Sequence, residues 1–435
     1  MDIKTITVIG ANGTMGYNIA GIFAAFGECK VFMVCRNLDS ARQAKKKAML
    51  SVKGEAIEKY LIPADYCMLQ ECIDESDLIM ESVAENFQLK TEINKKIDCM
   101  IRKNQIICTG TSGLSIEKLS EFFSPTNQKH YLGVHFFNPP YNMVLCEVIP
   151  GKYTNRKIVE EVKKYAHDKL RRTIVEVKDS PAFLGNRIGF QFINEAIQTA
   201  EKYKYNGGID YIDAILGPFT GRNMAPITTA DFVGLDVHKA IVDNLYTSTQ
   251  DYANATFQLP NFVNKIIDAG NLGRKSHKGL YQTIIRDDGT KRLYVYDILT
   301  DSYREKYDYK FPFVEKMIEN LKIGDYQKAL DSLIENQSLE ARLCVEFLLK
   351  YALYSLVATN LVGDTIADAD SVMADGFGWV PPLALIHALG GTDTFYKLCR
   401  ERLGEAYFSK AEPGTLPNEL PTSKYDYRRY FRAKY

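Results

Sequence analysis

The chain has 435 residues, of which 46% are hydrophobic and 25% are charged, and its formal net charge at pH 7 is zero. A chain of this length is too long to fold around one ordinary hydrophobic core, which predicts two or three folded domains. A zero net charge argues against nucleic acid or an anionic membrane as a partner. The chain shows neither a signal-peptide pattern at its start nor an apolar run of about 18 residues, so we expect a soluble, cytoplasmic protein with no membrane contact.

The nine cysteines are scattered, with no CxxC pair and no His/Cys cluster. An odd number without metal-ligand spacing is typical of reduced thiols in a cytoplasmic protein. The sequence therefore predicts no disulfide framework and no metal.

The first part of the chain alternates short apolar runs with longer amphipathic stretches. Strands are predicted at 6–10, 30–34, 77–82, 105–109 and 131–135, with two further candidates at 144–149 and 173–177. Helices are predicted at 15–27, 39–60, 87–101 and 154–170. This βαβ rhythm predicts an α/β domain with a parallel, doubly wound sheet over residues 1–179.

The pattern changes at Asp179-Ser180-Pro181, after which it becomes helical. We expect an all-helical domain over 180–281, with Pro181 at the joint. The remaining segment, 282–435, begins irregularly, with a possible hairpin at 286–297, and then turns helical over 313–361.

Residues 367–391 resemble a degenerate copy of residues 210–234. Both begin with Asp-rich helical sequence, pass through a glycine-containing turn and a proline, and end on glycine after an apolar stretch. A short internal match predicts a second, degenerate helical domain within 282–435.

A glycine-rich turn, Gly10-Ala11-Asn12-Gly13-Thr14-Met15-Gly16, joins the first predicted strand to the first predicted helix. Glycines at such a turn let backbone N–H groups approach a pyrophosphate at the helix N-terminus. The spacing is GxxGxxG, one residue longer than the common GxGxxG. Its position between strand and helix predicts a nicotinamide dinucleotide site.

The second strand ends in Cys35-Arg36-Asn37, where an NAD site usually carries an acid for the ribose 2′-hydroxyl. Loss of that carboxylate removes repulsion of a 2′-phosphate, with which Arg36 can pair. The alternative is that Arg36 is merely solvated. The pattern slightly favours NADP and leaves NAD open.

The stretch HFFNPPYNMVLCEVIPG (135–151) places His135 at the end of one strand and Glu147 within the next. A chain reversal at Asn138-Pro139-Pro140 can bring the two side chains together. Oxidation of a secondary alcohol needs a base for the hydroxyl proton, and a carboxylate behind a histidine fixes its tautomer. We predict His135 as the general base and Glu147 as its partner.

Several motifs, in this order, resemble the 3-hydroxyacyl-CoA dehydrogenase family over about residues 4–281. They are the glycine turn, ESVAENFQLK (81–90), TSGLSI (111–116), HFFNPP (135–140), DSPAFLGNR (179–187), ADFVGLD (230–236) and GRKSHKGLY (273–281). The resemblance implies a Rossmann-like domain followed by a helical domain. It also implies interconversion of 3-hydroxyacyl-CoA and 3-ketoacyl-CoA with NAD(P), as in the β-oxidation of fatty acids.

The resemblance also implies roles for individual residues. Ser112 and Asn186 would hydrogen-bond the substrate oxygen and the histidine region, and Glu85, Lys90 and Asn138 would lie near the nicotinamide end of the cofactor. Each has a structural alternative: Ser112 and Asn186 as helix caps, and Glu85 and Lys90 as exposed charges at a helix start.

The chain departs from the family pattern at several points. The family's asparagine two positions before Ser112 is Gly110, and the segment between Arg36 and Asp77, which in the family grips coenzyme A, is short. Its Lys45-Lys46-Lys47 run either meets coenzyme A phosphates or is a solvated helix face. The alternatives are therefore a dehydrogenase of a free hydroxy acid and a non-catalytic nucleotide-binding relative.

Simple family members end near GRKSHKGLY and pair their helical domains across a dimer, whereas this chain continues for about 150 residues. Larger relatives use a tandem copy in place of the partner subunit. We therefore expect an internal pseudo-dimer that acts as a monomer, with a homodimer as the alternative.

Overall fold

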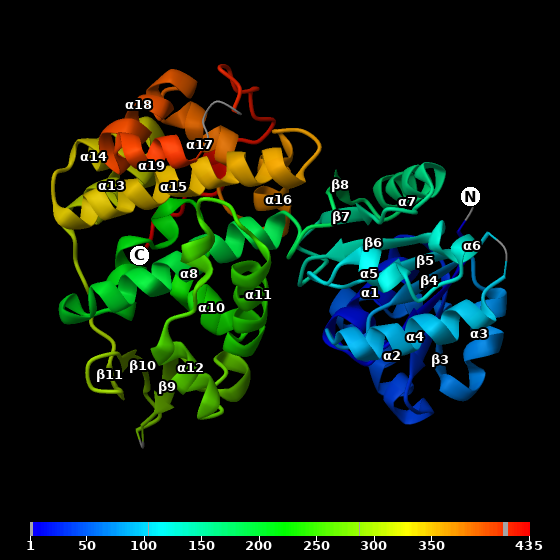
Figure 1. The fold of residues 1–435 in the computed structure, drawn as a ribbon. Coiled ribbons are helices and arrows are strands. Elements are labelled where there is room, and N and C mark those ends of the chain that lie inside the picture. Colours follow the sequence, from blue (N-terminus) through cyan, green and yellow to red (C-terminus); the bar gives the residue numbers. More distant parts are fainter. Residues whose placement is uncertain (1–2, 103, 287, 412–415) are drawn as a thin grey trace. The chain divides into compact units, whose positions relative to one another are not determined.

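The computed structural model describes residues 3–102, 104–286, 288–411 and 416–435 (Figure 1). Contacts between residues divide the chain into two units. The first comprises Met1–Phe183, Val362–Asp364 and Asp375–Phe377, and the second comprises Leu184–Leu361, Thr365–Ala374 and Gly378–Tyr435. These contacts do not separate 180–281 from 282–435, so the three-part division of the chain stays a prediction.

The first unit is built on an eight-stranded sheet in the order β3-β2-β1-β4-β5-β6-β7-β8. Its strands are β1 (Thr5–Ile9), β2 (Lys30–Cys35), β3 (Leu61–Asp65), β4 (Leu78–Glu81), β5 (Ile106–Thr109), β6 (Tyr131–Phe136), β7 (Leu145–Pro150) and β8 (Thr173–Glu176). Every predicted strand is present. The sequence missed β3, an edge strand that contains Pro63, because proline is tolerated there and conceals the strand pattern.

Strands β1 to β6 are parallel, as predicted, whereas β7 runs antiparallel to β6. The chain returns from β6 to β7 through a short turn, and no crossover helix intervenes. A short turn joins only antiparallel strands. The consequence is a register in which His135 lies opposite Glu147.

Helices cover both faces of this sheet. They are α1 (Thr14–Ala25), α2 (Leu38–Val52), α3 (Leu69–Glu75), α4 (Phe87–Met100), α5 (Ile116–Ser120), α6 (Pro125–Gln128) and α7 (Arg156–Asp168). One apolar core joins α1, α2 and α7 to the sheet. The opposite face meets α3 through Thr7, whose hydroxyl donates to Cys72 O, and α4 through Asn94, whose amide donates to the Tyr131 hydroxyl.

The helix predicted over 39–60 is wrong in its second half. Helix α2 ends at Val52, where Lys53 adopts a left-handed backbone with φ 52° and Gly54 follows. Such a residue ends a helix because its backbone leaves the right-handed region. The chain then forms a 3₁₀ helix (Glu55–Tyr60) and enters β3.

The second unit is mainly helical. Its first part contains α8 (Gly185–Lys202), α9 (Ile209–Ile215), α10 (Pro226–Val233), α11 (Leu235–Ser248) and α12 (Asn261–Asp268). A three-stranded antiparallel sheet follows, with β9 (Tyr281–Ile285), β10 (Lys291–Asp297) and β11 (Ser302–Glu305). The hairpin predicted near 286–297 is therefore confirmed.

The helices after this sheet include the predicted 313–361 block. They are α13 (Pro312–Lys322), α14 (Tyr326–Glu335), α15 (Leu339–Val362), α16 (Asp368–Phe377), α17 (Pro382–Ala388), α18 (Thr392–Leu403) and α19 (Glu405–Lys410). Helix α15 has the length and apolar composition of a membrane span, and 78% of its most apolar window is buried inside the protein.

The two similar segments in the second unit share a capping arrangement. Asp213 of α9 accepts hydrogen bonds from Ile227 N and Thr228 N at the start of α10, each at 2.8 Å. Asp370 of α16 likewise accepts from Leu383 N at the start of α17, at 2.7 Å. Each carboxylate satisfies N–H groups that a helix start leaves unpaired. This shared geometry supports the predicted repeat.

The two similar segments and the helices α8 and α15 also contact one another within the second unit. Val380 N donates to Gly221 O at 2.6 Å, and Lys350 Nζ lies 2.7 Å from Glu195 Oε1. Arg222 is buried against the rings of Phe192 and Trp379. The internal pseudo-dimer and the oligomeric state stay predictions.

Candidate active site

The glycine turn has a local geometry that only glycine allows at two positions. Gly10 has φ +85°, and a Cβ there would lie 2.6 Å from Ser82 O. A Cβ on Gly16 would collide with Gly10 O. Gly13 is the N-cap of α1, with no side-chain cap and no acidic residue in the first turn. The N–H groups at this helix start therefore remain available to an anionic group, and the turn fits a dinucleotide pyrophosphate.

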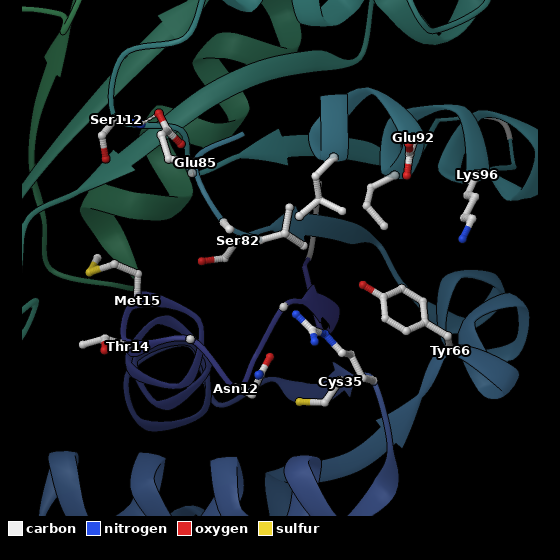
Figure 2. A pocket seen from close by; sticks show the side chains of 18 residues that line it. Asn12, Thr14, Met15, Cys35, Tyr66, Ser82, Glu85, Glu92, Lys96 and Ser112 are labelled. Carbon is white, nitrogen blue, oxygen red and sulfur yellow. Dashed lines mark hydrogen bonds between the residues drawn. The ribbon is translucent and has the colours of Figure 1, made fainter. Parts of the chain in front are cut away.

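A cleft of about 600 Å³ opens beside this turn (Figure 2). Its lining includes most of the predicted cofactor residues: Gly10, Gly13, Thr14, Met15, Arg36 and Glu85. Ser112, predicted to bind the substrate, lines it as well. Gly16, Lys90 and Asn138 do not line it. Figure 2 shows Ser112 and Glu85 at one end of the cleft and Tyr66 and Lys96 at the other.

His135 and Glu147 form the predicted pair. His135 Nδ1 lies 2.8 Å from Glu147 Oε2, and the side chains are 5% and 0% exposed. A carboxylate only accepts hydrogen bonds, so the proton of this contact is on Nδ1. Nε2 is then the basic nitrogen of the ring, and the buried carboxylate opposite can stabilise the imidazolium that forms when Nε2 takes a proton.

Aromatic rings pack around His135. The ring centre of Phe137 lies 4.6 Å from that of His135, edge-on, and Phe183 lies at 5.6 Å. These contacts hold the imidazole in one orientation. The described residues contain no group of three or more His, Cys, Asp and Glu side chains placed to hold a metal ion.

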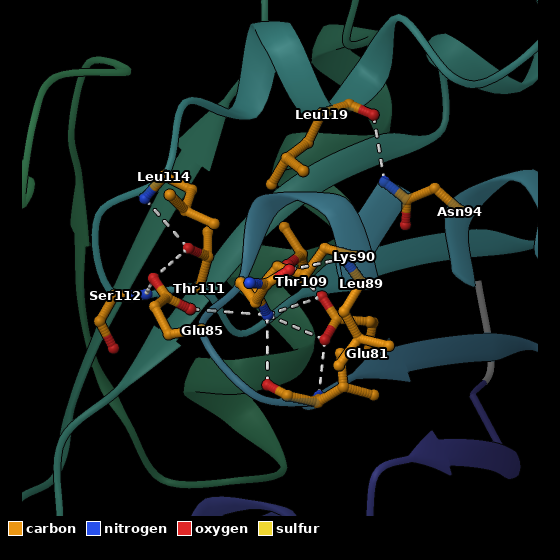
Figure 3. A network of polar contacts seen from close by, with 12 residues as sticks. Glu81, Glu85, Leu89, Lys90, Asn94, Thr109, Thr111, Ser112, Leu114 and Leu119 are labelled. Carbon is orange, nitrogen blue, oxygen red and sulfur yellow. Dashed lines mark hydrogen bonds and ion pairs between the residues drawn. The ribbon is translucent and has the colours of Figure 1, made fainter. Parts of the chain in front are cut away.

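A buried ion pair is bonded to the loop that lines the cleft (Figure 3). Lys90 Nζ is 2.9 Å from Glu81 Oε1 and 3.0 Å from Oε2, and both side chains are 1% exposed. Glu81 also accepts from Thr109 Oγ1 at 2.7 Å and from Val83 N at 2.6 Å. Buried charges are stable only with such partners. The network fixes the 82–85 loop that lines the cleft.

The same network reaches the predicted Glu85 and Ser112. Glu85 Oε1 accepts from Ser112 N at 2.8 Å and from Thr111 Oγ1 at 2.6 Å, and Glu85 Oε2 lies 3.6 Å from Lys90 Nζ. The suggestion that Lys90 is only an exposed charge is therefore wrong, because it is buried.

The capping alternatives for Ser112 and Asn186 are also wrong. The N-cap of α5 is Ser115, whose side chain accepts from Lys118 N, and the N-cap of α8 is Leu184. Asn186 is 7% exposed in the first turn of α8, in the second unit. Its predicted role beside the histidine stays a prediction.

The remaining predicted residues lie outside the cleft. Asn138 is exposed after the end of β6. Lys45 Nζ lies 3.6 Å from Glu58 Oε1, Lys47 Nζ lies 5.8 Å from the ring centre of Tyr17, and Lys46 is exposed. Their role with coenzyme A stays a prediction.

The far end of the cleft is formed by the end of β2 and the residue after β3. Burial raises the pKa of the Cys35 thiol to about 11, so this strand end carries no negative charge at neutral pH. Burial also raises the pKa of Tyr66, and its hydroxyl stays neutral. Arg36 is exposed beside them.

Sequence reasoning missed Glu81, Tyr66, Glu92 and Lys96. One signal for Glu81 was present: it ends the apolar run DLIME, and a carboxylate in a buried strand needs a partner. Tyr66 and Lys96 carried no such signal, because only the packing of β3 and α4 brings them to the cleft.

Residues 5–180 match the model of the 3-hydroxyacyl-CoA dehydrogenase NAD-binding domain, and residues 183–283 match that of the 3-hydroxyacyl-CoA dehydrogenase C-terminal domain. The chain belongs to the 3-hydroxyacyl-CoA dehydrogenase family. The resemblance seen in the sequence motifs is thereby confirmed.

Individual relatives carry names of the same family. The chain is 31% identical, over 95% of the relative and 64% of its own length, to a 3-hydroxybutyryl-CoA dehydrogenase of Bradyrhizobium diazoefficiens. It is 31% identical, over 84% of its own length, to a Bacillus subtilis protein named as a probable 3-hydroxyacyl-CoA dehydrogenase, of which it spans only 45%.

A solved structure extends the fold comparison beyond residue 283. The 3-hydroxybutyryl-CoA dehydrogenase of Escherichia coli K12 superposes with a TM-score of 0.68, over 95% of this chain and 98% of that one, at 19% identity. This likeness supports the fold of the C-terminal extension as well as that of the first 283 residues.

Proposed function

We propose that this chain interconverts a 3-hydroxyacyl-CoA and the corresponding 3-ketoacyl-CoA with a nicotinamide dinucleotide. One observation carries the proposal: the 2.8 Å contact between His135 Nδ1 and Glu147 Oε2, in a chain of this family. It leaves Nε2 as a base of defined orientation, which is what oxidation of a secondary alcohol requires.

The chain's own residues have distinct tasks in this proposal. In the oxidative direction, His135 Nε2 takes the proton of the substrate 3-hydroxyl as hydride leaves the carbon that bears this hydroxyl. Glu147 stabilises the resulting imidazolium. In the reductive direction, the same nitrogen returns that proton to the carbonyl oxygen. Ser112 and Asn186 are proposed to hydrogen-bond the substrate oxygen.

The cleft is the proposed place of the cofactor. The free N–H groups at the start of α1 receive the pyrophosphate, and Glu85 and Ser112 mark the end nearest the chemistry. When bound, the dinucleotide supplies the acceptor or donor of hydride. The Glu81–Lys90 pair keeps the 82–85 loop in place for it.

The decisive assay follows the absorbance of the reduced nicotinamide with acetoacetyl-CoA as substrate, run in parallel with NADH and NADPH. We expect turnover with at least one of the two cofactors. No turnover with either, by protein that still binds the cofactor, would contradict the proposal and favour a non-catalytic relative.

A second candidate function is oxidation of a free hydroxy acid on the same fold. It is favoured by the short α2 segment, where Lys45 is paired with Glu58. Acetoacetate and free 3-hydroxybutyrate, assayed beside their coenzyme A thioesters, separate the two. A higher kcat/KM for the free acids would identify this alternative.

A further inference from the structure

The end of the cleft opposite Glu85 and Ser112 has an unusual charge. In an NAD site, a carboxylate at the end of the second strand accepts hydrogen bonds from the ribose hydroxyls and repels a 2′-phosphate. Here that position is Cys35, which is buried and whose thiol stays neutral. The neighbouring strand ends in Asp65, but its carboxylate accepts from Cys67 N at 3.0 Å, and Asp65 is not part of the lining.

Two cations line this end of the cleft from different elements. Arg36 follows β2 and is exposed, and among the described residues its guanidinium makes no ion pair. Lys96 projects from α4, with its Nζ 5.7 Å from the ring centre of Tyr66 (Figure 2). Arg36 and Lys96 therefore offer positive charge to one part of the cleft.

One carboxylate partly offsets the positive charge of Arg36 and Lys96. Glu92 lies one turn before Lys96 on α4 and also lines the cleft. It is exposed, and its position four residues before Lys96 allows a surface pair of small energy. Two cations against one solvated carboxylate leave this end of the cleft net positive.

We propose that Arg36 and Lys96 form a 2′-phosphate site, so that the protein binds NADP(H) in preference to NAD(H). A guanidinium can bind a phosphate through two parallel hydrogen bonds, and an ammonium adds a point charge. The inference rests on the proposed function only in taking the cleft as the dinucleotide site. It assigns Lys96, which the sequence did not indicate, as a determinant of cofactor selectivity.

The test measures binding without turnover. Isothermal titration calorimetry of the full chain compares 2′,5′-ADP with 5′-AMP, which share the adenosine half and differ in the 2′-phosphate. We expect 2′,5′-ADP to bind at least about tenfold more tightly, because charge-assisted hydrogen bonds to a phosphate are worth that factor or more. Equal affinities would overturn the proposal.

Variants locate the effect. Arg36→Ala is expected to lower the affinity for 2′,5′-ADP by about tenfold to a hundredfold, and Lys96→Met by about threefold to tenfold, with 5′-AMP little changed. Lys95→Met is the matched control, because Lys95 is exposed on the same helix over the ring of Phe122 and does not line the cleft. If Arg36→Ala weakens both ligands equally, or Lys95→Met acts like Lys96→Met, the proposal is wrong.

The proposal and the proposed function fail in different ways. Turnover of acetoacetyl-CoA with NADH, together with equal affinity for the two nucleotides, would refute the 2′-phosphate site and leave the dehydrogenase intact. Selective binding of 2′,5′-ADP, lost in Arg36→Ala, without turnover of any thioester would refute the proposed function and support the site.

Discussion

Each of the two units contains a histidine that is almost completely enclosed, and the two differ in their partners. His135 in the first unit has a carboxylate 2.8 Å from Nδ1. His238 of α11 in the second unit has Nε2 at 3.0 Å from the amide oxygen of Asn194 and packs against Phe190, and its Nδ1 has no partner in the described part of the chain. Burial lowers the pKa of His238 to about 3.

The difference shows what makes a buried histidine chemically useful. A neutral partner cannot offset the cost of placing a charged imidazolium in the protein interior, so His238 remains neutral and structural. A carboxylate can offset that cost, so the His135 ring can accept a proton. Burial is common to both residues, and the partner decides the role.

Replacing each of the two histidines is the strongest test of this comparison. We expect His135→Ala to lower kcat for acetoacetyl-CoA reduction by about 10²–10⁴-fold, the usual contribution of a general acid–base group. His238→Asn should keep the wild-type kcat, as its control. A His135→Ala enzyme that turns over at the wild-type rate would remove the proposed base.

The buried Lys90–Glu81 pair extends the comparison to structural charges. Lys90→Met leaves the Glu81 carboxylate buried without its cation and should lower the free energy of unfolding by about 3–5 kcal/mol. The double variant Glu81→Gln with Lys90→Met should recover much of that loss, since both charges are gone. Urea unfolding measures both. A double variant as unstable as Lys90→Met would show that packing of the lysine stem, and not charge, dominates.

Replacing Glu147 tests whether the carboxylate sets the tautomer of His135. In Glu147→Gln the amide can donate to Nδ1, which would place the ring proton on Nε2 and remove the base. We expect kcat to fall by about tenfold to a thousandfold with little change in KM. Glu147→Asp, which keeps a carboxylate, should retain more of the activity than Glu147→Gln does. Equal losses would assign Glu147 a packing role only.

The pH dependence of stability tests His238. Its pKa is about 3 in the folded protein, against an ordinary histidine pKa of about 6.5, because the imidazole is buried. The unfolded chain therefore binds a proton below pH 6.5 that the folded protein does not bind, and stability is lost as pH falls from 6.5 towards 3. Between pH 7 and pH 5 this costs about 2 kcal/mol. In urea unfolding, the free energy of unfolding that is lost between pH 7 and pH 5 should be smaller by that amount in His238→Asn than in the wild type. An equal loss in the two proteins would contradict this account.

Local sequence was sufficient for the elements whose pattern is contiguous. The glycine turn joins its own strand and helix, and His135 and Glu147 lie on strands that a short turn connects, so their meeting followed from the chain's direction alone. The predicted repeat of 210–234 in 367–391 rests on aspartates and prolines that recur at similar spacing.

Residues brought together from separate elements were not predictable in this way. Glu81 and Lys90 are paired because α4 lies against the end of β4, and Lys96 and Tyr66 share the cleft because α4 and β3 flank it. Propensity and periodicity say nothing about such distances. The edge strand β3 was missed for a related reason: only pairing with β2 makes Leu61–Asp65 a strand.

The sequence by itself determined the family, the dinucleotide turn and the histidine–carboxylate pair, because each depends on residues close along the chain or on a turn that joins adjacent strands. The tertiary structure alone decided that Lys90 is buried, that Ser112 is not a helix cap, and that Arg36 and Lys96 line the same cleft. Burial and electrostatic partners are set by packing between distant segments, and it is those partners that give a histidine, a lysine or an arginine its chemistry.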